Sequence, residues 1–600
     1  MEILSFEFDV AVHTRTWHKC VFRNELVEAG MKRTKWMIIM MLLLSGCGQT
    51  PADEAVSVQP TTTPPPTATA YVTVEPEPTE RPPESLLVDS NAFFATSGVC
   101  AQCHTGSQDE SGMDVSTDTQ WRASMMANAA RDPYWQAELA ALFETEGLDG
   151  PSVESFCANC HTPMAAYIAL QEGSPAELLE NGALADSHPD HALAMDGVSC
   201  TVCHQIEDKD LGFPASYSGG YQIEAQAAAE GRPAFGIFEP AESDRASMRA
   251  VSGFVPEQSQ HLNQSEFCAT CHTLYTPIYT AQGETGEVFP AQTPYFEWFY
   301  SEYRNTTTCL DCHMPEAEGS VRLTNQETPL RVPYYQHSFA GGNTYVLGLL
   351  DAYQEDLGAT ASLQHFRKAY ETLITQLEEE TADISLQNSR IVDTWMRLDL
   401  LVENYAGHKF PTGNSSRRVW IHLRVTDAAG ETVFESGAWE PSGLITGNDF
   451  DETGMDFEPH YDQITSSDQV QIYETIPVDS AGRITTVFLY AAARAKDNRL
   501  LPAGFNLDRT FRDFAIYGEA GEDDDFIGGE DSIRYLFDTS GYTEPFTVSA
   551  ELLFQMIGYR WIADLDGEAV EIQRFLTYTE AIPPVPERLS GFEVDVVKGE

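Results

Sequence analysis

The chain has 600 residues, with 92 acidic and 35 basic side chains and a formal net charge of −57 at pH 7. This charge excludes nucleic acid as a partner, because binding to phosphates needs the opposite sign. The length predicts two or three domains.

The chain begins with residues 1–30, which show neither a signal nor a domain pattern, so that Met31 is the expected start of the protein. Residues 31–47 contain three basic side chains, a short apolar run and Ser-Gly before Cys47. The apolar run is too short to span a membrane. The segment resembles a bacterial lipoprotein signal, which implies that Cys47 is lipidated and anchors an exported protein to a membrane. Residues 48–88 are rich in Pro, Thr and Glu and are predicted to form an extended tether.

Five Cys-X-X-Cys-His units follow within residues 89–345, which we interpret as one domain. Their cysteines are Cys100 and Cys103, Cys157 and Cys160, Cys200 and Cys203, Cys268 and Cys271, and Cys309 and Cys312, and their histidines are His104, His161, His204, His272 and His313.

Three chemistries compete for these cysteine pairs. A redox dithiol would occur once in the chain, not five times. Structural zinc needs two Cys-X-X-Cys units to reach four ligands, so that five units would leave one without a partner. The histidine directly after the second cysteine indicates c-type haem, in which both thiols form thioethers and the imidazole is the proximal iron ligand. The sequence therefore predicts five covalently attached haem c groups, with zinc or disulfides as the weaker alternatives.

The predicted haem domain has few signals of an ordinary core. Residues 132–144 repeat apolar side chains at helical spacing, which predicts a helix. No other stretch of this domain has enough continuous periodicity, so the haems are expected to form much of its core and the rest to be helical or irregular.

Each haem iron has a second axial position that the motif does not fill. We predict His191, His261, His337 and His408 as distal ligands, because each lies near a haem motif or in a glycine-containing loop. His188 is a further candidate. His365, His422 and His460 are expected to be structural.

Residues 346–384 are predicted as a helical connector, with a helix over 361–381. Residues 385–585 change to a period of two and predict an antiparallel, β-sandwich-like domain without haem. Strands are expected at 417–425, 483–493 and 546–556, with a turn at 427–430. Residues 586–600 are expected to be a tail. The predicted fold class is thus α+β and multidomain, with a haem-packed domain followed by a β domain.

Two acidic loops, 449–456 and 522–531, have compositions that suit Ca²⁺. The first has carboxylates at alternate positions, but His460 stands where the last bidentate glutamate of an EF-hand loop should be. We expect solvated loops, and keep Ca²⁺ as the weaker alternative.

Several stretches resemble the multihaem cytochrome c family related to the tetrahaem cytochrome of ammonia oxidisers. They are "FCATCHTLY", "CLDCHMPE", "HSFAGGN", "NYAGHKFPTGNSSRRVWIHLRV", "DQVQIYETI" and "AKDNRLLPAGF", in this order between residues 95 and 580. The resemblance implies an electron carrier with closely packed, mostly bis-histidine haems and a C-terminal β domain. In "WRASMMA", Met126 stands where related cytochromes have a histidine. The haem that this histidine would bind is therefore expected to have Met126 as its sixth ligand, to have His188 instead, or to have an open site.

The expected function is electron transfer to redox proteins or extracellular acceptors, at the periplasmic or outer face of the cell envelope. One alternative is a reductase or oxidase of a small nitrogen or sulfur compound at a five-coordinate haem. Another is a subunit of an extracellular cytochrome filament.

Overall fold

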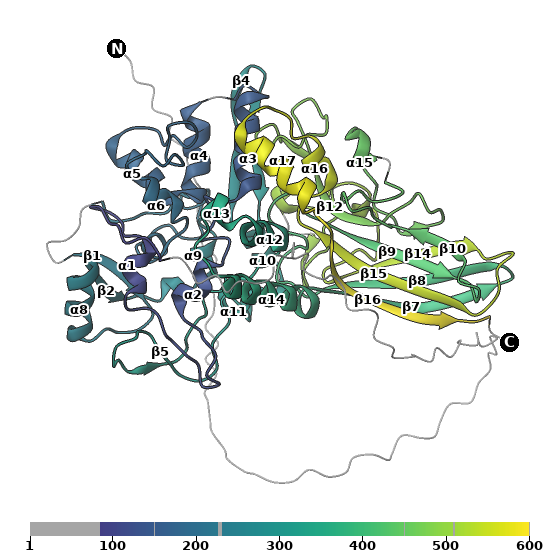
Figure 1. Cartoon of the computed structure of the whole chain (residues 1–600). Coiled ribbons are helices and arrows are strands. Elements are labelled where there is room, and N and C mark those ends of the chain that lie inside the picture. Colours follow the sequence, from purple (N-terminus) through teal and green to yellow (C-terminus); the bar gives the residue numbers. More distant parts are fainter. Residues whose placement is uncertain (1–84, 149, 226–230, 449, 508–510, 599–600) are drawn as a thin grey trace, which may run out of the picture. The chain divides into compact units, whose positions relative to one another are not determined.

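The computed structural model describes residues 85–148, 150–225, 231–448, 450–507 and 511–598, which all fall in one compact unit (Figure 1). The predicted extension, the lipoprotein signal with Cys47 and most of the tether lie outside the described residues. Within the described ranges, no helix has the length and apolar character that a membrane crossing requires.

The first part of the described chain consists of short helices with two-stranded sheets between them. The helices are α1 (Ser97–Ala101), α2 (Thr117–Arg122), α3 (Pro133–Glu144), α4 (Pro151–His161), α5 (Pro163–Glu172), α6 (His191–Met195), α7 (Cys200–Cys203), α8 (Glu242–Ser252), α9 (Ser265–Cys268), α10 (Pro294–Phe299), α11 (Cys309–His313), α12 (Thr344–Ala352), α13 (Gln354–Leu357) and α14 (Leu363–Glu380). The strand pairs are β1 (Arg232–Gly236) with β2 (Phe254–Gln258), β3 (Leu274–Thr280) with β4 (Gly283–Gln292), and β5 (Val321–Arg322) with β6 (Leu330–Arg331).

Two predicted helices form where the sequence has clear start signals. The Asp132 side chain caps α3 by accepting hydrogen bonds from the backbone N–H groups of Tyr134 and Trp135. Ser362 caps α14 in the same way through the N–H of His365, and α14 buries one apolar side against the core. The helices expected at 132–144 and 361–381 are therefore confirmed.

The second part of the chain forms two larger sheets. One has the order β13-β12-β9-β15-β16, with β10 also paired to β9, and the other has the order β11-β14-β8-β7. The strands are β7 (Ala382–Val392), β8 (Trp395–Asn404), β9 (Arg418–Thr426), β10 (Thr432–Ser436), β11 (Gln463–Ile464), β12 (Ile472–Val478), β13 (Ala493–Asp497), β14 (Glu530–Asp538), β15 (Phe546–Gln555) and β16 (Glu587–Val596). Three short helices, α15 (Phe450–Thr453), α16 (Tyr559–Ala563) and α17 (Val570–Ala581), lie between these strands in the sequence. The mixed α+β fold class is as expected, with the sheets in the C-terminal part (Figure 1).

One predicted strand is wrong. Residues 483–492 form turns and one isolated bridge, and the strand begins only at Ala493. The β-branched residues of this stretch have strand propensity, but its apolar side chains pack elsewhere. Leu489 is buried against Leu139 and Leu142 of α3, and its carbonyl accepts a hydrogen bond from Tyr279. Tertiary packing against the helix overrides local propensity here.

The stretch 586–600, which was expected to be a tail, contains strand β16. This strand pairs antiparallel with β15 from Phe546↔Val596 to Phe554↔Glu587, with one bulge. Its buried side chains include Leu589, Val594 and Val596. Only Glu593 and Asp595 of this strand are exposed, so that no continuous period of two marks it in the sequence.

One apolar cluster joins the two parts of the chain. It contains Tyr134 of α3, Phe366 of α14, Leu398 of β8, Leu423 of β9 and Phe575 of α17. The C-terminal helix α17 packs along α3, more than 400 residues earlier in the chain (Figure 1). The β part is therefore fixed to the part that carries the cysteine motifs, through a shared core.

Candidate haem-binding site

A cavity of about 1610 Å³ lies between the N-terminal helices and the β part, and all fifteen cysteines and histidines of the five motifs line it. Pockets for one small molecule usually measure roughly 300–1,000 Å³. The cavity is thus larger than one small ligand needs, and its lining is mostly apolar.

Each motif folds locally so that its three functional side chains share one side of a turn. The backbone N–H of His104 donates to the carbonyl of Cys100 at 2.9 Å, and the N–H of His272 donates to that of Cys268 at 3.0 Å. A helical turn places residues i, i+3 and i+4 on one face. The two thiols and the imidazole of each unit can therefore contact one ligand together.

Four of the five motif histidines have a fixed tautomer. Their Nδ1 atoms lie at hydrogen-bond distance from backbone carbonyls of other segments: His104 to Leu323 (3.1 Å), His161 to Ala129 (2.9 Å), His204 to Phe235 (2.6 Å) and His313 to Ala340 (2.5 Å). A carbonyl only accepts, so Nδ1 carries the proton and the lone pair is on Nε2. Metal-ligating histidines are oriented in this way.

Burial keeps these imidazoles in the neutral form that binds metals. It lowers the pKa of His161 to about 4 and, together with the charges of His313 and Arg417, that of His272 to about 4. A neutral imidazole with Nε2 free is the ligand that haem iron requires.

The thiols of different motifs lie next to one another. In three pairs, each thiol shifts the pKa of the other: Cys100 with Cys200, Cys160 with Cys271, and Cys268 with Cys309. All ten motif cysteines are free thiols. The first motif is thus beside the third, and the fourth is beside both the second and the fifth.

The charge of a further thiol acts on one of these pairs. The pKa of Cys271 is raised well above its usual value by its neighbour Cys160 and by burial, and then by the charge of Cys203. Cys203 belongs to the third motif, which therefore lies near the fourth. The motifs form a branched arrangement, with the fourth motif at the branch point.

His408 faces the fifth motif as a distal ligand would. Its ring centre lies 6.2 Å from that of His313, and the two ring planes differ by 9°. Two imidazoles on opposite sides of one metal, each bound at about 2 Å, have ring centres roughly 6 Å apart. His408 Nδ1 is bonded to the carbonyl of Lys409 at 2.9 Å, which leaves Nε2 free. The geometry fits a bis-histidine pair.

His337 and Met126 also line the cavity. His337 Nδ1 lies 3.1 Å from the carbonyl of Tyr335, so that its Nε2 is free as well. Burial, followed by the charge of His204, lowers the pKa of His337 to about 3. Both side chains have the chemistry of a sixth ligand, and the structure brings both to the cavity wall.

His261 is buried, but its ring nitrogens already have partners. Nδ1 lies 2.6 Å from the hydroxyl oxygen of Ser259, and Nε2 lies 2.8 Å from the carbonyl of Ile206. The side chain is not among the described residues that line the large cavity. Its role as a ligand stays a prediction.

His191 and His188 also lie away from the large cavity. His191 lines a separate cavity of about 160 Å³, with Nδ1 3.3 Å from the carbonyl of Ala183 and Nε2 3.4 Å from a carboxylate oxygen of Asp186. His188 Nδ1 accepts a hydrogen bond from the N–H of Asp190 at 3.2 Å. Their roles as ligands stay predictions too.

The cavity wall contains ionisable groups that the sequence did not single out. Burial raises the pKa of Asp132 to about 6 and that of Glu138 to about 7, and it lowers the pKa of Arg417 to about 10. In the sequence, both residues lie in the stretch 132–144, whose apolar spacing predicts a helix and gives no indication of a site. Only the fold turns both toward the cavity.

In loop 449–456, the carboxylate of Asp451 is not free to bind Ca²⁺. Asp451 is buried, and its carboxylate lies 2.6 Å from an Nη atom of Arg418 and 3.7 Å from Nε of Arg560. Two arginines therefore already neutralise this carboxylate. His422, which was expected to be structural, lies on β9 between Glu435 and Glu551.

Comparisons with known proteins give a distant similarity. No family model matches the chain, and no curated protein matches it. Among solved structures, a penta-heme cytochrome c552 from Thermochromatium tepidum is similar with a TM-score of 0.48 and 16% identity, covering 84% of this chain and 98% of that one. At this similarity the residues of the chain itself must carry any functional conclusion.

Proposed function

We propose that the protein is a multihaem c-type cytochrome that transfers electrons. The observation that carries the proposal is the single cavity into which all five Cys-X-X-Cys-His motifs point, with four of the five imidazoles held with Nε2 free. Haem c, when bound, supplies an iron centre that is reversibly reduced by one electron.

The residues fit that group in three respects. The thiols are unpaired and lie one helical turn apart, as two thioether bonds to one porphyrin require. Burial favours the neutral form of the proximal imidazoles, and backbone carbonyls orient four of the five. The remaining lining is largely apolar, which suits the faces of a macrocycle.

The contacts between motifs favour transfer along a connected set of centres. Thiols of neighbouring motifs shift one another's pKa, so that groups attached to them would be close together. A branched set has three ends, at the first, second and fifth motifs. Electrons would enter at one end and leave at another. The haem of the fourth motif would lie on every path between two ends.

A reductase is the second candidate, and the cavity wall gives a specific reason to keep it. Asp132 and Glu138 have pKa values of about 6 and about 7, which suit proton transfer near neutral pH. Arg417, also in this wall, could bind an anion. A small nitrogen or sulfur compound could react there if one iron lacks a sixth ligand.

The cellular setting follows from sequence alone. We propose an exported protein, lipid-anchored through Cys47 at the periplasmic or outer face of the envelope, with redox proteins or extracellular acceptors as partners. Assembly into a filament is the remaining alternative, and size-exclusion chromatography of the mature protein at micromolar concentration tests it.

The haem count tests the proposal directly. The protein, produced in a host that matures c-type cytochromes, should carry five haems per chain through denaturation and acid-acetone extraction, as measured by intact mass. Four or fewer under adequate haem supply would contradict five attachment sites. Carrier and reductase are then separated by carbon monoxide binding to the reduced protein and by turnover of nitrite or hydroxylamine, because a carrier with six-coordinate irons shows neither.

A further inference from the structure

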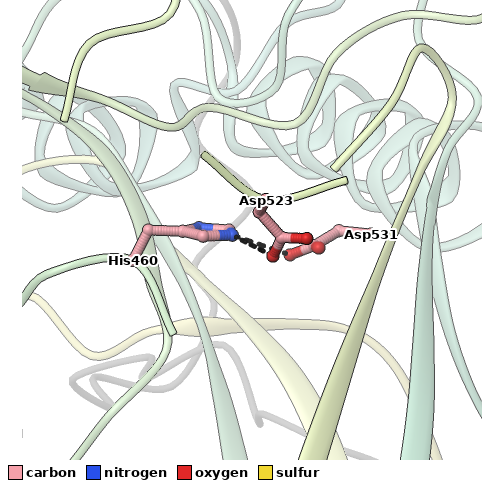
Figure 2. A group of neighbouring side chains, drawn as sticks. All are labelled: His460, Asp523 and Asp531. Carbon is pink, nitrogen blue, oxygen red and sulfur yellow. Dashed lines mark hydrogen bonds and ion pairs between the residues drawn. The ribbon is translucent and has the colours of Figure 1, made fainter. Parts of the chain in front are cut away.

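Outside the haem cavity, two loops bring five ionisable side chains together. His460 and Asp462 lie just before β11, Asp523 and Asp525 lie in the loop before β14, and Asp531 lies in β14 itself. Ligand atoms of His460, Asp523 and Asp531 lie within 4.8 Å of one another, and so do those of Asp462, Asp523 and Asp525. Figure 2 shows the first three side chains pointing toward one another. Asp523 belongs to both groups.

The proton on His460 is fixed by two amides. The Gln471 side-chain oxygen accepts from the backbone N–H of Tyr461 at 2.8 Å, so that its NH₂ group faces His460 Nδ1 at 2.9 Å. The Asn498 oxygen likewise accepts from the N–H of Glu474 at 3.0 Å, and its NH₂ group lies 3.1 Å from the same Nδ1. Nδ1 therefore accepts hydrogen bonds and has no proton.

The consequence is that Nε2 carries the ring proton and donates it to Asp523 at 3.2 Å. A transition metal at Nε2 would have to displace this proton. His460 therefore acts as a donor that orients Asp523, and the oxygen atoms of the carboxylates are left as ligands.

Asp531 gives an independent indication of a missing partner. Its side chain is fully buried, and its Oδ2 accepts a hydrogen bond from the Tyr473 hydroxyl at 2.7 Å. Its Oδ1 has no hydrogen-bond partner among the described residues. Leaving a buried carboxylate oxygen unpaired is costly, and such atoms in folded proteins have a reason. The carboxylate points into the cluster beside Asp523 (Figure 2).

The cluster also has more negative charge than its surroundings balance. The charges of Arg534 and Lys496 reach the cluster, but each side chain is already in an ion pair. Arg534 is bound to Asp399 at 2.9 Å, and Lys496 is bound to Glu474 at 3.1 Å. Among the described residues, no Lys or Arg side chain forms an ion pair with the carboxylates of the cluster, whose only ion-pair partner is His460. A bound cation would balance their charge.

We propose that this cluster binds one Ca²⁺ ion through Asp462, Asp523 and Asp525, with His460 orienting Asp523 and Asp531 adding an oxygen from the buried side. Ca²⁺ takes six to eight oxygen ligands in flexible geometry, which suits carboxylates from separate loops, one side being open to water. Mg²⁺ demands stricter octahedral geometry and binds more weakly here. The ion holds the loop before β14 against the loop before β11.

Calorimetric titration of the chelator-treated haem protein with CaCl₂ tests the proposal. One ion per chain should bind, and Asp525→Asn should weaken binding by at least about tenfold, because a charged ligand is lost. Asp524→Asn is the matched control: Asp524 is exposed, lies in the same loop and is absent from both groups, so that Ca²⁺ affinity should not change. Asp525 is exposed as well, which makes folding of that variant secure.

Three results would overturn the proposal: no Ca²⁺ binding to the wild type, unchanged affinity in Asp525→Asn, or an equal loss in Asp524→Asn. Tighter binding of Zn²⁺ than Ca²⁺, lost in His460→Gln, would show that the imidazole is a ligand and that the proton assignment is wrong. The haem count is measured separately, so failure of this site leaves the proposed function untouched.

Discussion

At the scale of single residues, four of the five motifs and His408 show how backbone carbonyls prepare side chains for a ligand. The sequence places a histidine after each cysteine pair, but the free nitrogen of that histidine is decided elsewhere. Leu323, Ala129, Phe235 and Ala340 supply the carbonyls, and none of them lies within the motif that it orients.

The first prediction concerns His408. His408→Met should keep the fifth haem low-spin but raise its reduction potential, because a thioether favours ferrous iron relative to imidazole. A spectroelectrochemical titration of the wild type and the variant measures the shift in one of five centres. His422→Gln is the control, since His422 lies on β9 outside the cavity, and its titration should match the wild type. An unchanged titration in His408→Met would show that His408 does not bind the haem iron.

The second prediction concerns Asp531 in chelator. Its folded pKa of about 8 lies above the ordinary value of 3.8, so that its contribution to stability is fully present below about pH 4 and is lost as the pH rises toward 8. Asp531→Asn cannot ionise and keeps an oxygen for the Tyr473 hydroxyl. The variant should therefore be more stable than the wild type at pH 8, by roughly 1–2 kcal/mol, and equal to it at pH 4. Denaturant unfolding followed by circular dichroism at both pH values measures this; a constant difference would contradict it.

At the scale of elements, β16 shows that the chain end is part of the sheet. Leu589, Val594 and Val596 are buried against β15 and its neighbours. The third prediction is that truncation after residue 585 lowers the free energy of unfolding by several kcal/mol, because three apolar side chains lose their burial at about 1.5–3 kcal/mol each. Thermal unfolding measures the effect. Truncation after residue 598 is the control and should have the wild-type melting temperature.

The elements also show what sequence can predict. Helices α3 and α14 and strands β9 and β15 follow from local periodicity, because each has one buried face along its whole length. The strand prediction is wrong for residues 483–492, because Leu489 packs in one cluster with side chains of α3. No local sequence pattern shows this packing. Strand β16 is not predicted, because acidic and glycine residues interrupt the alternation of its apolar residues.

The candidate site also has a part that the sequence predicts and a part that it does not. The Cys-X-X-Cys-His motifs can be predicted, because their spacing alone indicates haem attachment. The cavity-lining roles of Asp132, Glu138 and Arg417, and the meeting of His460 with Asp523, depend on segments that are distant in sequence. Long-range packing creates those sites, so that spacing alone cannot predict them.

At the scale of the whole molecule, a buried charge network joins α10 to the β part beside the His408 loop. A carboxylate oxygen of Glu297 lies 3.0 Å from an Nη atom of Arg499, which also binds Asp497 at 2.8 Å. The other Glu297 oxygen accepts a hydrogen bond from the Thr412 hydroxyl at 2.6 Å. Asp497 in turn binds Lys409, the residue after His408, at 3.0 Å.

These contacts link stability to haem ligation, which gives the last prediction. Glu297→Gln removes a fully buried charge and leaves Arg499 with less compensation, which should cost about 3 kcal/mol of unfolding free energy. Because Thr412 and Lys409 belong to the same loop as His408, the change should also loosen the distal ligand. Thermal unfolding and the paramagnetic resonance spectrum of the oxidised protein should therefore change together. Glu302→Gln, at an exposed position outside the network, should change neither. A destabilised Glu297→Gln protein with wild-type haem spectra would show that the network supports the core but not the iron ligand.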